Sequence, residues 1–174
     1  MDGETEFVDS NVIVYAHDRN AGDKRNKARE LLSRLDSTGS GALSVQVLQE
    51  FVVTAGQKVK QPLPYKDLQA ILEDLSDWIV FCPGPADVLD ALSLSQRFHF
   101  SFWDAMIVQA SLQVKAATLW SEDLSDGQDY GGVVVRNPFK GRADHSSSSW
   151  QQRSITTADA RIKTPSSSGR TSTP

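Results

Sequence analysis

An α/β fold with a central parallel sheet, covered by helices on both faces, is predicted for this chain of 174 residues. Short apolar runs alternate with segments of helical periodicity, which is the pattern of strands joined by crossover helices. Polar residues directly follow several of these runs. The single cysteine rules out an internal disulfide framework, and the length suits one domain with a core of its own.

The first apolar run reaches Asp9, passes through Ser10 and Asn11, and becomes apolar again at Val12. Asp and Asn are disfavoured inside strands and favoured at turns and helix caps, so we predict a strand ending near Asp9 and a short helix starting near Asn11. In open α/β sheets ligands bind at the carboxyl ends of the strands, which would place Asp9 at a ligand crevice. A local role as a helix cap is the alternative.

The remaining elements are predicted in the same way from periodicity and capping residues. Asn20 or Asp23 is expected to cap the second helix and Gly39 to follow its end. Residues 78–81 are wholly apolar and predict a buried parallel strand, after which Cys82 is expected to be a small buried residue. The other predicted segments are strands at 41–44, 117–120 and 133–135, and helices at 20–39, 45–58, 68–75, 88–98 and 101–112.

Charge is distributed unevenly along the chain. Residues 1–142 carry 14 Lys and Arg against 20 Asp and Glu. Such an acidic body does not favour nucleic-acid binding, but it suits a pocket whose carboxylates are neutralised by a divalent cation. The basic segment 24–34 is interpreted as a solvated helix face, with an RNA-backbone contact as the alternative.

The sequence predicts neither a membrane-spanning segment nor a second folded domain. No apolar stretch is long enough to span a bilayer and the acidic N-terminus is unlike a signal peptide, so a soluble cytoplasmic protein is expected. Residues 143–174 contain nine serines, five threonines and few large apolar residues. We therefore predict a folded domain over 1–142 and a disordered C-terminal tail over 143–174.

Four carboxylates are the candidate site residues: Asp9, Glu50, Asp104 and Asp123. Each follows a predicted strand end or lies in the first turns of a helix, and all four would share one edge of the sheet. Each also has a local explanation, since Glu50 fits a surface position and Asp104 fits a capping box with Ser101. The capping role is compatible with metal binding, because the positive end of a helix dipole favours an ionised carboxylate.

Four carboxylates sharing a crevice require a cation, because like charges raise one another's pKa. A hard divalent ion with oxygen ligands, Mg²⁺ or Mn²⁺, is the expected choice. The three histidines are scattered along the sequence and do not suggest a softer metal.

At this point the sequence resembles the PIN-domain ribonucleases, and most closely the VapC-like toxins of type II toxin–antitoxin systems. The resemblance spans about residues 6–140 and rests on four ordered segments: FVDSNV (7–12), VLQEF (47–51), FWDA (102–105) and SEDL (121–124). It implies a three-layer α/β/α fold and Mg²⁺- or Mn²⁺-dependent cleavage of single-stranded RNA. It also implies a homodimer and an antitoxin that occludes the site, for which the surface around 20–38 and 45–75 is the expected contact.

The resemblance also assigns roles to individual residues. Asp9 and Asp104 match the metal-binding carboxylates, while Glu50 and Asp123 complete the acidic cluster and would position a water, deprotonate it or hold a second metal. Ser10 and Asn11 match the polar pair that orients the first aspartate. The tail departs from the family, either as an extension or as read-through of the normal end.

Two other functions fit parts of the pattern. A catalytically inactive PIN-like module that binds RNA or protein is the first, although such members would be expected to lose one or more of the four carboxylates. A phosphotransfer domain of the haloacid-dehalogenase type also begins with an aspartate after a strand. That chemistry uses a second aspartate two residues on, where this chain has Asn11.

Overall fold

The structure, a computed structural model, describes residues 4–140, and the predicted tail lies outside this range. Five short strands and six α-helices alternate along the chain, and one π-helical turn directly extends α3. The strands are β1 (Glu6–Val8), β2 (Gly41–Ser44), β3 (Ile79–Phe81), β4 (Thr118–Trp120) and β5 (Val134–Arg136). The helical elements are α1 (Ser10–His17), α2 (Asp23–Thr38), α3 (Val45–Val53), η1 (Thr54–Lys58), α4 (Tyr65–Leu75), α5 (Pro85–Phe98) and α6 (Phe102–Gln113).

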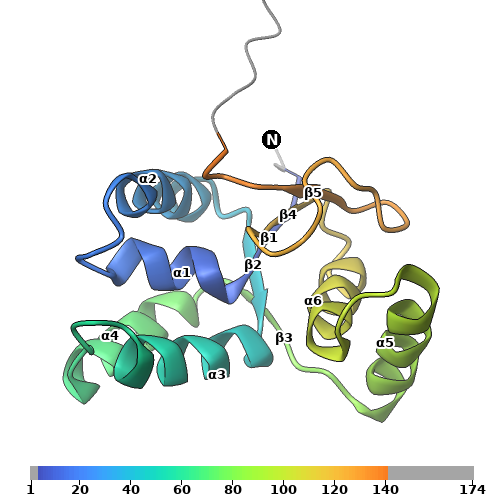
Figure 1. Cartoon of the computed structure of the whole chain (residues 1–174), viewed down its shortest axis with the longest axis horizontal. Helices are drawn as coiled ribbons and strands as arrows, with labels where there is room; N and C mark the ends of the chain where they lie inside the picture. Colours follow the sequence, from blue (N-terminus) through green and yellow to red (C-terminus); the bar gives the residue numbers. More distant parts are fainter. Residues whose placement is uncertain (1–3, 141–174) are drawn as a thin grey trace, which may run out of the picture. The chain divides into compact units, whose positions relative to one another are not determined.

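The strands form one parallel sheet in the order β3-β2-β1-β4-β5, with β1 at its centre. Helices α1 to α4 cover one face of this sheet, and α5 and α6 cover the other (Figure 1). Right-handed crossovers explain the division, because the chain moves outward from β1 to β3 and then returns past β1 to β4. The predicted three-layer α/β/α fold is confirmed.

One apolar core lies between the sheet and the helices. The central strand is fully buried at Phe7 and Val8, and the core continues into α1 through Val12 and Ile13. A glycine is required at position 41, because a Cβ there would lie 2.3 Å from the ring of Trp78. The indole can therefore pack across the start of β2 only when that residue has no side chain.

Several local predictions were wrong. β3 is the edge strand of the sheet, so its residues are exposed or half-buried, and Ile79 is 46% exposed. Cys82 follows this edge and is exposed as well. The second helix has Gly22 at its N-cap in place of Asn20 or Asp23, whereas Gly39 ends it in the left-handed conformation as expected.

The chain order creates a crevice at the centre of the sheet. From β1 the chain proceeds to β2 and β3 on one side, while β4 and β5 lie on the other side. The carboxyl ends of β1 and β4 therefore flank the point where the strand order reverses, which is where open α/β sheets bind their ligands. Asp9 directly follows β1, and Ser121 directly follows β4.

Candidate active site

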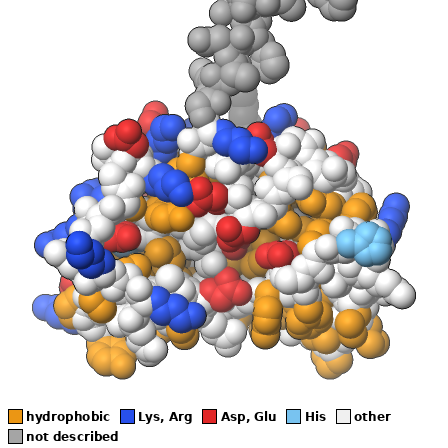
Figure 2. Space-filling view, viewed as in Figure 1, with side chains coloured by type: hydrophobic (Ala, Val, Ile, Leu, Met, Phe, Trp, Pro, Cys, Tyr) orange, Lys and Arg blue, Asp and Glu red, His pale blue; other side chains and the backbone are white. Residues whose placement is uncertain are grey.

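Acidic side chains gather at the centre of one face, between α1 and α3 on one side and α6 on the other (Figure 2). Asp9 lies at the bottom of this region and is only 6% exposed. It is the N-cap of α1, and its Oδ1 accepts a hydrogen bond of 2.6 Å from the backbone N–H of Ser10. The predicted boundary between strand and helix at Asp9 is confirmed, and so is the capping role.

Asp9 also has partners that capping does not explain. Its Oδ2 accepts hydrogen bonds from Ser121 Oγ at 2.7 Å and from Asn11 Nδ2 at 3.0 Å. Ser121 is 112 residues away in sequence, but Val8 and Trp120 pair across β1 and β4, so the residues after them are neighbours. The pairing of β1 with β4 therefore places Ser121 where its hydroxyl can hydrogen-bond the Asp9 carboxylate.

Asn11 joins Asp9 to a second carboxylate. Its side-chain amide donates to Asp9 Oδ2 and to Asp123 Oδ2, each at 3.0 Å. An aspartate at this position would have no proton to donate and would repel both groups. The geometry thus requires an amide at position 11 and disfavours the haloacid-dehalogenase alternative, whose chemistry needs a carboxylate there.

Glu50 approaches the same cluster from α3. Its Oε2 accepts a hydrogen bond of 2.7 Å from Ser10 Oγ, and its Oε1 accepts one of 2.8 Å from Gln46 Nε2. The side chain is half-buried rather than free at the surface. Ser10 and Asn11 therefore connect Asp9 to Glu50 and Asp123, respectively.

Asp104 is held differently. Ser101 caps α6, with its Oγ accepting from the Asp104 backbone N–H at 3.1 Å and donating to Asp104 Oδ2 at 2.7 Å. No hydrogen bond joins the Asp104 side chain to the other three carboxylates within residues 4–140. Its neighbour Trp103 is tied to the cluster, because Gln46 donates to both Glu50 and the Trp103 carbonyl oxygen, the latter at 3.2 Å.

The environment of Asp9 disfavours its charge. Burial raises the pKa of its carboxyl from an ordinary 3.8 to about 6, against the hydrogen bonds from Ser121 and Ser10, which lower it. The negative charges of Glu50 and Asp123 also contribute to this increase. A cation near these groups would favour the ionised form of Asp9.

The donor set suits a hard divalent cation, since it consists of carboxylate oxygens with no nearby thiol. The side chains are not gathered around a common point, however. Across residues 4–140, no three His, Cys, Asp or Glu side chains are grouped so that they could hold a metal ion. The carboxylates of Asp9, Glu50 and Asp123 are instead linked to one another through hydrogen bonds with Ser10 and Asn11.

Two residues of the site were not predicted. Ser121 could have been found from strand alignment, because it occupies in the fourth strand the place that Asp9 occupies in the first. Gln46 lies four residues before Glu50, which puts both on one face of α3. His17 has a structural role, since its Nδ1 lies 2.9 Å from the Ile13 carbonyl oxygen and its ring packs edge-on against Phe51.

The structure defines the general class of this protein. It is an α/β protein with a parallel sheet, and its acidic side chains lie where the strand order reverses. Residues 7–125 match the PIN domain family, and the chain belongs to that family. No curated protein matches the sequence. The resemblance drawn from the four segments is thereby confirmed for the family.

Solved structures share the fold. A toxin–antitoxin complex from Klebsiella pneumoniae contains a chain that superposes with a TM-score of 0.59 at 19% identity, covering 78% of this chain and 99% of that one. VapBC2 from Rickettsia felis, bound to a DNA fragment from its promoter, gives a TM-score of 0.53 at 18% identity, with coverage of 76% and 98%. In the part of the chain that the structure describes, no helix is long and apolar enough to cross a membrane.

Proposed function

We propose that this protein is a metal-dependent endoribonuclease that cleaves phosphodiester bonds of single-stranded RNA, and that it is the toxin of a toxin–antitoxin pair. PIN domains are generally nucleases, and the two solved structures described above are toxin–antitoxin complexes. The observation that carries the proposal is the buried Asp9, whose charge is opposed by Glu50 and Asp123 at the reversal point of the sheet.

The proposal assigns Mg²⁺ or Mn²⁺ to Asp9 and Asp104. A bound divalent ion supplies charge stabilisation at a phosphate and lowers the pKa of a coordinated water. Asp104 is the third residue of α6, near the positive end of the helix dipole, which attracts negatively charged groups. The Gln46 contacts to Glu50 and to the Trp103 carbonyl keep the start of α6 beside the cluster.

The other groups orient the donors and the attacking water. Ser121, Ser10 and Asn11 fix both oxygens of Asp9, which leaves its carboxylate with one orientation. Glu50 and Asp123 are the candidates to position or deprotonate the water. Both are held by donors that leave further lone pairs free to accept a proton or a water hydrogen.

We further propose a cognate antitoxin as the protein partner and a homodimer as the assembly. The support is the family and the two toxin–antitoxin complexes with the same fold. Co-expression with a short neighbouring gene should relieve growth inhibition and yield a complex. A protein that is harmless alone and forms no such complex would remove the toxin assignment without removing the nuclease one.

A non-catalytic PIN module remains the second candidate, favoured by the carboxylates' lack of a common metal-binding point. An assay on single-stranded RNA with Mg²⁺, with Mn²⁺ and with EDTA separates the two. We expect cleavage with either metal and none with EDTA, with double-stranded RNA and single-stranded DNA as substrate controls. RNA binding without cleavage at any metal concentration would overturn the enzyme assignment in favour of the binding module.

A further inference from the structure

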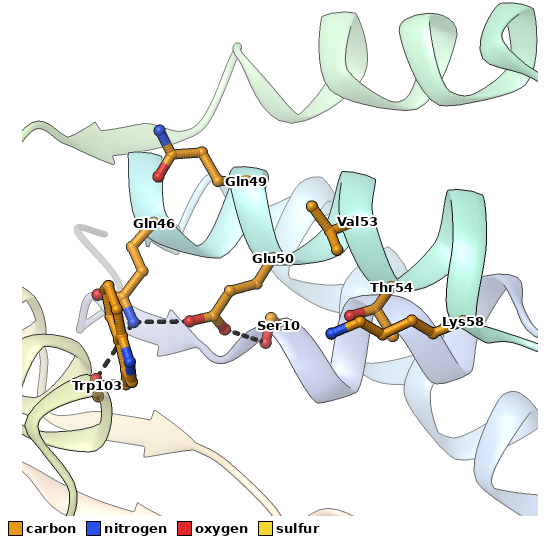
Figure 3. A pocket seen from close by; sticks show the side chains of 8 residues that line it. All are labelled: Ser10, Gln46, Gln49, Glu50, Val53, Thr54, Lys58 and Trp103. Carbon is orange, nitrogen blue, oxygen red and sulfur yellow. Dashed lines mark hydrogen bonds between the residues drawn. The ribbon is translucent and has the colours of Figure 1, made fainter.

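A pocket opens directly beside the acidic cluster. Its volume is about 510 Å³, and it is lined by Ser10, Gln46, Gln49, Glu50, Val53, Thr54, Lys58 and Trp103. Trp103 stands at one end and Lys58 at the other, with Glu50 and Ser10 between them (Figure 3). The pocket therefore shares Ser10, Gln46 and Glu50 with the candidate site and extends it along α3.

The π-helical turn η1 keeps Lys58 at this pocket. Gln46, Glu50, Thr54 and Lys58 are spaced four residues apart, and such a row drifts around an ideal α-helix because four residues exceed one turn. The wider turn of η1, closed by the Val59 N–H on the Thr54 carbonyl oxygen at 3.1 Å, reverses that drift. All four side chains consequently line one pocket.

The two ends of the pocket carry an exposed aromatic ring, which packs edge-on against Phe102, and an exposed lysine. Trp103 is 64% exposed, although tryptophan is usually largely buried in a protein without a partner. Lys58 is exposed and makes no ion pair with any residue from 4 to 140, whereas Lys24 and Arg34 both do. An exposed aromatic ring and an ammonium group without an ion pair in residues 4–140, at opposite ends of one pocket, match the two parts of a nucleotide, its base and its phosphate.

We propose that this pocket binds one nucleotide of single-stranded RNA next to the scissile phosphate, with the base stacked on Trp103 and a phosphate paired with Lys58. This inference rests on the proposed nuclease function. Single-stranded nucleic acid is bound in general by aromatic platforms and cations along the backbone. Gln49, exposed on the rim, supplies a donor and an acceptor for a base edge.

The test measures RNA binding by the full chain, in EDTA to stop metal-dependent cleavage, by fluorescence anisotropy of a labelled short RNA. We expect Trp103→Ala to weaken binding roughly 5- to 150-fold, with Trp103→Phe retaining part of the affinity. Lys58→Gln should lower the slope of log affinity against log salt by about 0.7, the value for one phosphate contact on a single strand. In Mg²⁺, both variants should raise KM more than they lower kcat.

Matched controls lie outside the pocket on α4. Tyr65→Ala removes an aromatic side chain that is 84% exposed, and Lys66→Gln removes an exposed lysine. Neither should change RNA affinity or its salt dependence. Thermal unfolding of all variants checks folding, and quenching of tryptophan fluorescence by RNA should decrease in Trp103→Phe, which folds with a ring in the same place.

The outcomes distinguish the two proposals. If wild-type protein cleaves RNA and the Trp103 and Lys58 variants bind it as tightly as wild type, the nucleotide pocket is wrong and the nuclease stands. If wild-type protein neither binds nor cleaves RNA, the proposed function fails and the pocket assignment fails with it. Variants that bind RNA normally but lose a co-expressed antitoxin would show the pocket to be a protein contact, which also overturns the inference.

Discussion

Asp9 and Asp104 both lie at the start of a helix, but their surroundings are opposite. Asp9 is buried, and its carboxylate accepts hydrogen bonds from Ser10, Asn11 and, across 112 residues of sequence, Ser121. Asp104 is half-exposed, and within residues 4–140 its side chain hydrogen-bonds only to Ser101, three residues earlier. The same residue type at similar helix positions is thus fixed by tertiary structure in one case and by local structure in the other.

The contacts of Asp9 therefore say more about function than those of Asp104 do. Helix capping accounts for one hydrogen bond of Asp9, and the remaining contacts place a buried charge beside two other carboxylates, which is costly without a cation. Capping accounts for every hydrogen bond that Asp104 makes within residues 4–140. The assignment of Asp104 therefore depends on experiments more than that of Asp9 does.

The largest effect is expected for Asp9→Asn. The new amide group would face the donors of Asn11 or Ser121, so the variant loses both a charge and a hydrogen bond. We expect RNA cleavage to fall by about 10³-fold, as when a group that stabilises transition-state charge is removed. The free energy of unfolding should fall by about 1–3 kcal/mol, the cost of an unsatisfied buried polar group.

Cleavage assays and thermal unfolding with and without Mg²⁺ measure both effects. Asp67→Asn, an exposed aspartate in the first turn of α4, is the control and should behave as wild type. Wild-type cleavage by the Asp9 variant would remove Asp9 from the site and leave it as a cap.

Asp104→Asn should affect activity almost as strongly and stability hardly at all. A metal ligand at this position loses a charged donor but keeps its shape, so we expect cleavage to fall by orders of magnitude, Mg²⁺ to lose its stabilising effect, and metal-free stability to change little. If Asp104 is only part of a cap, the substitution should instead cost about 0.5–2 kcal/mol and leave cleavage nearly intact.

Ser101→Ala provides the matched comparison, because it removes the cap while keeping the carboxylate. It should lower the unfolding temperature and retain most of the activity. An Asp104→Asn variant that melts early yet cleaves normally would contradict the metal-site assignment.

The same contrast explains which features could be predicted from the sequence. Caps are local, so Asp9, Ser101 and Gly39 were placed correctly from their neighbours alone. The position of a strand within the sheet is not local, and the apolar run 78–81 gave no indication that it would form the edge. Ser121 was missed for the same reason, since only the pairing of β1 with β4 brings it to Asp9.

Other differences arise from backbone geometry that residue preferences do not encode. Periodicity predicted one continuous helix over 45–58, whereas α3 ends at Val53 and the chain continues as the wider π-helical turn at Thr54–Lys58. Gly22 starts α2 with a positive φ of 56°, a conformation that was not expected when polar side chains were available nearby.

Ser121→Ala should produce an intermediate effect that depends on pH. The folded-state pKa of Asp9, about 6, lies above its ordinary value of 3.8, so ionising Asp9 opposes folding. The protonated form of Asp9 therefore contributes to the free energy of unfolding. This contribution is fully present below about pH 4, and it is lost as the pH rises through about 6. Removing the Ser121 hydrogen bond, which lowers the pKa, should extend the loss to higher pH.

Metal binding should depend on the same pKa of Asp9 but with the opposite pH dependence, because a ligand carboxylate must be ionised. The increase in unfolding temperature caused by Mg²⁺ should diminish as the pH falls through about 6 in wild-type protein. In Ser121→Ala it should diminish at a higher pH. Coincident pH profiles for the two proteins would show that Ser121 does not control the ionisation of Asp9.

The smallest effect is expected for Lys24→Met. This variant tests whether a contact from α2 keeps the loop after β4 in position. Lys24 pairs with Glu122, and this hydrogen bond lowers the pKa of Glu122 despite the opposing effect of burial. Because the pair is partly exposed, its loss should cost no more than about 1 kcal/mol. Glu122 adjoins Asp123, so we also expect a several-fold slower cleavage.

Arg34→Met breaks a comparable pair with Glu6, at 2.7 Å, which lies at the start of β1 and not beside Asp123. It should cost a similar amount of stability and leave cleavage unchanged. Equal loss of activity in both variants would mean that stability, and not the position of Asp123, explains the effect. A loss confined to Lys24→Met would show that this half of the cluster depends on a distant contact, as Asp9 depends on Ser121, whereas Asp104 depends on its own helix.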